Sequence, residues 1–159
     1  MIIHLETWIT VLIDIAAWFI IHMAVAYLVS LKPRASFNPD AWLYRKINWE
    51  NEGLLYQRVF LVNKWKEKLP DGAALFNTGF VKRRLAEYSK SYFDDFIKET
   101  CRAELTHWIA FLFGFIFFIW NIPWVSILMI IYAIAANMPC ILTQRYNRIR
   151  LTRVRSNYY

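Results

Sequence analysis

The hydrophobic and polar positions of this chain alternate in long blocks, which predict an all-α integral membrane protein. An apolar run extends from Thr7 to about Leu31, and no Lys, Arg, Asp or Glu occurs between Leu105 and Thr143. The first run is long enough for one membrane-spanning helix. The second is too long for one buried helix of a soluble protein and long enough for two crossings. We therefore predict about three transmembrane helices, at about 8–30, 106–122 and 124–143.

The basic residues predict how these helices are oriented. All 19 Lys and Arg lie either between Lys32 and Arg102 or after Gln144, and none lies in the turn near Asn121. Loops rich in Lys and Arg remain on the cytoplasmic side of a membrane. We therefore expect the amino terminus and the Asn121 turn outside, and the basic tail, 144–159, in the cytoplasm.

The segment of about 32–104 between the first two crossings is predicted to be helical, cytoplasmic and interfacial. Helix starts are expected at Asn38, which is followed by a proline, and at Asn48, which is followed by acidic residues. A last helix should begin near Ser89 and continue into the membrane. No repeat or linker is visible, so the whole chain, 1–159, is predicted to form a single domain.

Composition narrows the class of partner. Hydrophobic residues make up 58% of the chain, which is too apolar for an ordinary soluble domain. The net charge of +7 would suggest nucleic acid in a soluble protein, but no basic residue lies in the apolar runs. The charge therefore indicates loops facing anionic lipid, with the bilayer as partner and no nucleic acid. Cys101 and Cys140 have no metal-binding spacing and are interpreted as free thiols.

Two ionisable residues interrupt the first apolar run. Asp14 and His22 share a stripe with Trp18 when the run is drawn as a helix. Ionisable groups inside a membrane are candidates for function, because burying them unpaired is costly. The alternative is that they pair with another helix, for example through Tyr132 or Asn137, and hold the helices together. The sequence leaves both interpretations open.

Glu104 and His107 are the candidate catalytic residues. They lie three residues apart on one helical face, at the point where a charged helix enters the apolar stretch. His107 would act as general base, and Glu104 would orient its ring and stabilise its charged form. The alternative is a pair that extends to the lipid headgroups. Glu-x-x-His also occurs in di-iron bundles, but a second copy of the motif is missing here, so no metal is predicted.

Basic residues at two other places are candidate binding residues. Arg145, Arg148 and Arg150 directly follow the third apolar run and could bind a phosphate, although the topology rule alone would also explain them. The amides of Gln144 and Asn147 favour binding, because topology requires charge and not amides. In the central segment, Lys64, Trp65 and Lys66 combine an aromatic ring with ammonium groups, a combination typical of a membrane-interface anchor.

Three ordered blocks carry a family resemblance. They are Lys64-Trp-Lys-x-Lys68 with Asp71-Gly72, then Glu99-Thr-x-Arg-Ala-Glu-Leu-x-His-Trp108, and finally Tyr132-Ala-x-x-Ala-Asn137-x-Pro139 with Gln144-Arg-Tyr-Asn-Arg-x-Arg-Leu151. On these blocks the chain resembles the bacterial glycosyl-4,4'-diaponeurosporenoate acyltransferases, the CrtO type of the staphyloxanthin pathway. Two positions depart from the family pattern: Ile149 stands where the family has proline, and Cys101 stands at a position not reserved for cysteine.

The resemblance implies a membrane O-acyltransferase in a bacterial cytoplasmic membrane. Its acceptor would be a sugar hydroxyl of a glycolipid or a glycosylated carotenoid, and its donor acyl-CoA or a similar thioester, with no bound cofactor. Through the matching blocks, Asp71, Arg102 and Asn137 join the substrate-binding candidates. The rival hypothesis is a small non-catalytic membrane subunit that binds a lipid headgroup or a partner enzyme. The acceptor, the acyl chain length and the oligomeric state are not predicted.

Overall fold

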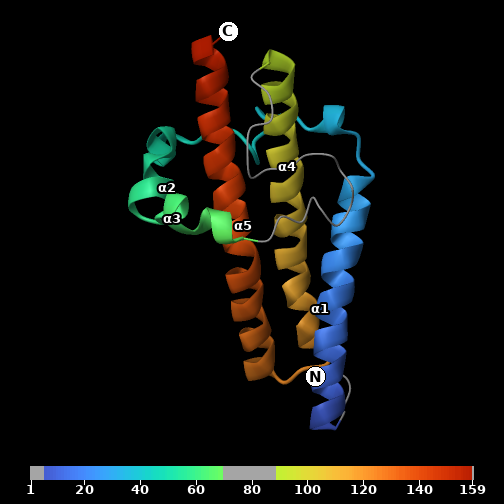
Figure 1. Ribbon diagram of the computed structural model, residues 1–159. Helices are drawn as coiled ribbons and strands as arrows, with labels where there is room; N and C mark the ends of the chain where they lie inside the picture. Colours follow the sequence, from blue (N-terminus) through green and yellow to red (C-terminus); the bar gives the residue numbers. More distant parts are fainter. Residues whose placement is uncertain (1–5, 70–88, 159) are drawn as a thin grey trace.

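Three long helices form the body of the protein in the computed structural model, which describes residues 6–69 and 89–158. They are α1 (Thr7–Ser30), α4 (Lys90–Phe113) and α5 (Pro123–Tyr158), and they lie side by side (Figure 1). A 3-10 helix, η5 (Gly114–Ile119), continues α4. No strand occurs among the described residues. The three helices are long and apolar enough to cross a membrane, which confirms the predicted all-α class, while their orientation stays a prediction.

Helices α4 and α5 extend well beyond the apolar stretch at the same end of the molecule (Figure 1). Helix α4 begins as predicted at Ser89, whose Oγ accepts a hydrogen bond from the backbone N of Tyr92 at 3.3 Å. Helix α5 continues through Pro139 to Tyr158, so residues 144–158 are an extension of the membrane helix and not a separate tail. Buried apolar side chains on this extension pack against the rest of the protein and keep it helical: Tyr146, Ile149 and Leu151.

Short elements follow α1 in the chain; the first lies beside α4, and the others lie beside α5 (Figure 1). They are η1 (Arg34–Ser36), η2 (Asn48–Gly53), α2 (Leu54–Arg58), α3 (Val62–Trp65) and η3 (Lys66–Lys68). The helix start predicted at Asn48 is confirmed as η2. The one predicted at Asn38 is wrong, because Asn38 Oδ1 accepts from the backbone N of Asp40 at 2.9 Å and forms a turn. The chain stays non-helical beyond it because α5 side chains bind the backbone carbonyls of residues 43–45.

Close backbone packing joins the helices inside the apolar region. A Cβ added at Gly114 would lie 3.0 Å from the Cβ of Ala133 on α5, so a larger residue there would push η5 and α5 apart. The Trp18 ring of α1 stacks on Phe117 with centroids 4.7 Å apart. These contacts bury the middle of the three-helix body, and most large apolar side chains of α1 remain exposed at its surface.

Asp14 fixes α1 to the α4–α5 turn. Its Oδ1 accepts hydrogen bonds from Trp120 Nε1 at 2.7 Å and Asn121 Nδ2 at 2.9 Å. His22 stacks on Trp18 with ring centroids 5.5 Å apart. Asp14 therefore pairs with another part of the bundle, as the structural interpretation predicted, although its partners are turn residues and not Tyr132 or Asn137.

We expect the α4–α5 turn near Asn121 and the short elements between α1 and α4 to lie on opposite sides of the membrane. In chains whose Cys101 and Cys140 are replaced by Ala, a membrane-impermeant maleimide should label Ile122→Cys in intact cells. Lys64→Cys should react only after lysis. Position 122 is chosen because Asn121 itself is buried. Labelling of position 64 from outside would contradict the predicted orientation.

Candidate functional site

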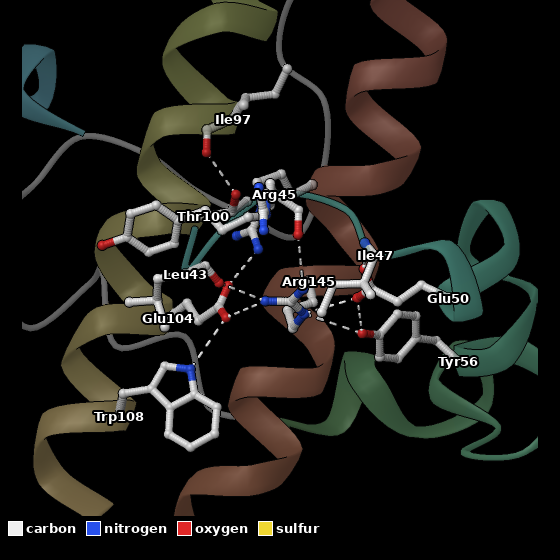
Figure 2. A network of polar contacts seen from close by, with 12 residues as sticks. Leu43, Arg45, Ile47, Glu50, Tyr56, Ile97, Thr100, Glu104, Trp108 and Arg145 are labelled. Atoms are coloured by element: carbon white, nitrogen blue, oxygen red, sulfur yellow. Dashed lines mark hydrogen bonds and ion pairs between the residues drawn. The ribbon is translucent and has the colours of Figure 1, made fainter. Parts of the chain in front are cut away.

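A buried ion cluster of Glu50, Glu104, Arg145 and Arg148 lies where α4, α5 and the short elements meet (Figure 2). Glu104 is fully buried and accepts hydrogen bonds from Arg145 Nη1 at 3.0 Å and Arg148 Nη2 at 2.6 Å. Trp108, one turn further along α4, donates its indole N–H to Glu104 at 3.2 Å. Each oxygen of the Glu104 carboxylate thus has a guanidinium partner.

Arg145 connects the cluster to the short elements. Its Nε donates to Glu50 Oε1 at 2.9 Å and to the Tyr56 hydroxyl at 3.2 Å. Its other nitrogens donate to the carbonyls of Leu43 at 2.8 Å and Arg45 at 3.2 Å. Arg148 Nε similarly donates to the carbonyl of Tyr44 at 3.1 Å. Two arginines of α5 therefore hold three successive carbonyls of the segment before η2.

Glu50 is held in the charged form by its partners. Burial acts to raise the pKa of its carboxyl, but hydrogen bonds from Arg145, Tyr56 and the Ile47 backbone, with the charge of Arg145, lower that pKa overall. The Tyr56 hydroxyl donates to Glu50, and burial followed by this contact raises the pKa of Tyr56. The cluster contains two carboxylates and two guanidinium groups, so it is electrically neutral.

These partners change two predicted roles. Arg145 and Arg148 were expected to bind donor phosphates, but their guanidinium groups lie inside the protein and bond carboxylates and carbonyls. Glu104 was expected to orient His107, yet its carboxylate is held by Arg145, Arg148 and Trp108. The physical reason is the same for both roles: a buried charge requires an opposite charge nearby. Here Glu104 is the partner of Arg145 and Arg148, and the two arginines are the partners of Glu104.

His107 has a different partner, on the neighbouring helix. Its Nδ1 lies 3.1 Å from Oδ1 of Asn137, which is fully buried in α5. Asn137 Nδ2 also donates to the carbonyl of Ala133 at 2.9 Å. Both residues belong to the stretch without Lys, Arg, Asp or Glu, and their contact puts the imidazole between α4 and α5 with an amide beside it.

A second basic group lies on the outer side of α5. Lys66 Nζ donates to Asn147 Oδ1 at 3.2 Å and lies 5.1 Å from the centre of the Tyr146 ring. The guanidinium carbon of Arg150 lies 5.8 Å from the centre of the same ring. Burial lowers the pKa of Lys66, the charge of Arg150 lowers it further, and Glu67 acts in the opposite direction. Two cations beside one aromatic ring favour an anion as ligand.

The other predicted binding residues are spread around the same end of the helices. Lys64 is exposed, and Trp65 donates its indole N–H to the Phe60 carbonyl at 2.8 Å. Arg102 pairs with buried Glu99 at 2.5 Å. Gln144 Oε1 is buried and has no hydrogen-bond partner among the described residues, which keeps it as a candidate contact for a ligand. Asp71 lies outside the described residues, so its predicted role is not addressed.

Sequence reasoning missed Glu50 and Tyr56 as site residues. Glu50 was interpreted only as a first-turn acid of a helix, because its partner Arg145 lies 95 residues further along the chain. No local spacing could have revealed that contact. Arg150 was expected as a phosphate contact, and only the fold shows that it shares the Tyr146 ring with Lys66.

Comparison with known proteins gives one consistent description. The family model described as glycosyl-4,4'-diaponeurosporenoate acyltransferase (CrtO) matches residues 40–157. A protein of that name from Staphylococcus haemolyticus is 34% identical over 140 residues, covering 88% of this chain and 81% of its own. One from Staphylococcus aureus is 36% identical over 137 residues, covering 86% and 82%. No solved structure matches the chain.

The ion cluster predicts a large loss of stability in Glu104→Gln. This change leaves two buried guanidinium groups with one carboxylate, and removing a partner from a buried ion pair costs about 3–5 kcal/mol. Unfolding in mixed detergent micelles should show the loss, and chymotrypsin should cleave faster near Trp42 and Trp49. Lys46→Gln, which removes the exposed pair with Glu52, is the control and should cost about 0–1 kcal/mol. Equal stability of the two variants would contradict the assignment.

Proposed function

The chain belongs to the family of glycosyl-4,4'-diaponeurosporenoate acyltransferases, and we propose that it transfers a fatty acyl chain to a sugar hydroxyl of a glycosylated membrane lipid. It is an acyltransferase, as its family and relatives indicate, so the rival hypothesis of a non-catalytic subunit is set aside. The acceptor would be a glycosylated carotenoid acid or another glycolipid, because the relatives are named for such a substrate.

The membrane setting of the reaction supports this proposal. Three helices are long and apolar enough to cross a bilayer, and a lipid acceptor would lie against their exposed apolar sides. The short elements pack against α5 through Tyr56, Val62 and Tyr146, within about one helical turn of Thr143, the end of the uncharged stretch. We place them at the cytoplasmic headgroups of a bacterial membrane, where sugar and acyl donor would meet.

His107 is the proposed general base, and the observation that carries this role is its position in the α4–α5 contact with a defined partner. The sugar hydroxyl would attack the thioester carbonyl while His107 accepts its proton. A C–O bond forms, the C–S bond breaks, and His107 returns the proton to the leaving thiolate. Direct transfer of this kind requires neither a protein nucleophile nor a resident cofactor.

Lys66 and Arg150 are the proposed contacts for the anionic part of the donor. They carry positive charge on one face of the protein, beside Tyr146, with the amide of Asn147 next to Lys66. This role replaces the one expected for Arg145 and Arg148, whose guanidinium groups are used inside the protein. An acyl-CoA would present several phosphate oxygens to such a pair, since charge-assisted hydrogen bonds to phosphate are strong.

His107→Ala should lose the general-base contribution, about 10²–10⁴ in rate, while remaining folded. Turnover per folded molecule would be measured with purified protein in lipid nanodiscs, an acyl-CoA donor and a glucosylated lipid acceptor. His22→Ala is the matched control, because His22, like His107, lies in an apolar helix. There it stacks on Trp18. Near-normal turnover of His107→Ala would end the assignment of His107 as base.

Lys66→Gln and Arg150→Gln should each raise the apparent KM for acyl-CoA and leave kcat nearly unchanged. Loss of one charge-assisted contact costs about 1.5–3 kcal/mol, which corresponds to roughly tenfold to a hundredfold in KM. Arg153→Gln, an exposed basic residue on the same helix, is the control. If all three variants keep the wild-type KM, the donor is bound elsewhere.

A further inference from the structure

We infer that Asn137 is a positioning residue that holds His107 in one tautomer, with the proton on Nδ1 and the lone pair on Nε2. This inference rests on the proposed function for its catalytic meaning, because it identifies which nitrogen would accept the proton. It does not rest on that function for its structural content, which follows from the hydrogen bonds of the Asn137 amide.

The orientation of the Asn137 amide is set by its own helix. One end of the amide lies 2.9 Å from the carbonyl oxygen of Ala133. A carbonyl oxygen only accepts hydrogen bonds, so the end that meets it must be the NH₂ group. The other end, which lies 3.1 Å from His107 Nδ1, is therefore the amide oxygen. The reverse orientation would bring two oxygens together inside a fully buried contact.

The tautomer of His107 follows from that orientation. An amide oxygen only accepts, so Nδ1 must be the nitrogen that carries hydrogen in the neutral ring. Nε2 then has the lone pair, and any group that meets Nε2 on the neutral ring must donate a hydrogen bond to it. A sugar hydroxyl is such a donor. Asn137 thus prepares the ring for the proton transfer that the proposed reaction requires.

A neutral amide fits this place better than a carboxylate would. His107 and Asn137 lie in the stretch without Lys, Arg, Asp or Glu, and Asn137 is six residues, about 9 Å along the helix, before Thr143. An ionised carboxylate at that depth would be costly unless it were paired. An amide orients the imidazole through the same kind of hydrogen bond without adding a charge to the apolar region.

Nitrogen NMR of the whole protein, labelled with ¹⁵N-histidine in lipid nanodiscs, tests the inference directly. The chain has three histidines, so His4→Gln and His22→Gln variants assign the signals of His107. At a pH where the ring is neutral, we expect a protonated, pyrrole-type signal at Nδ1 and an unprotonated, pyridine-type signal at Nε2. Protonation at Nε2 in the wild-type protein would overturn the inference.

Variants of Asn137 separate positioning from simple packing. Asn137→Ala should lose the preference for Nδ1 protonation and lower kcat by about 10²-fold, with the KM for donor unchanged. Asn137→Asp keeps an acceptor oxygen and should keep the Nδ1-protonated tautomer. Ser126→Ala is the control, because the hydroxyl of buried Ser126 lies against the carbonyls of Phe117 and Ile122 near the α4–α5 turn, and it should change neither signal nor kcat. An unchanged tautomer in Asn137→Ala would refute the role of Asn137.

The two proposals fail in different ways. If the tautomer is as expected in wild-type protein and changes in Asn137→Ala, yet His107→Ala remains active, then the positioning contact is real and the general-base role is wrong. If His107→Ala is inactive but the ring is protonated at Nε2, the base role stands and the role of Asn137 is wrong.

Discussion

The pairing of two arginines of α5 with Glu104 of α4 is the contact on which the arrangement of the other elements depends. Glu104 and Arg148 are almost completely removed from solvent, and charges so placed are tolerated only with opposite charges and hydrogen bonds around them. The same guanidinium groups bind Glu50 and three backbone carbonyls. One pair of side chains therefore fixes the register of α5 against α4 and the path of the chain between Leu43 and Glu50.

The helical body could be predicted from the sequence because its causes are local. Long apolar runs give the length of the helices, and the distribution of basic residues gives an expected orientation. The start of α4 at Ser89 was also predictable, since a serine before a helical segment caps it. The full length of α5 was not, because the basic residues of its extension suggested a solvated tail, while Tyr146 and Leu151 are buried against other elements.

The candidate site was predictable in its residues and much less so in its partnerships. Glu104 and His107 share a helical face, and nothing in that spacing tells which of them will meet an arginine and which an asparagine. The choice is made by α5, which presents Arg145 and Arg148 to one position and Asn137 to the other. The role of a basic residue at the end of an apolar run cannot be predicted from the sequence either. A positive charge there satisfies the topology rule whether or not the residue has a specific partner.

The ion cluster can form only late in synthesis, because its residues lie far apart in the chain. Glu50 and Glu104 leave the ribosome early, but their partner Arg145 follows 95 and 41 residues later. During that interval two carboxylates destined for the interior have no guanidinium group to neutralise them, and the segment from Leu43 to Tyr56 has nothing to hold its carbonyls. The membrane helices can form as they emerge, whereas the short elements can settle only when α5 has been made. A ribosome stalled before Arg145 would thus expose a chain with α1 and α4 made, α5 incomplete and the segment from Leu43 to Tyr56 still open to quality-control proteases.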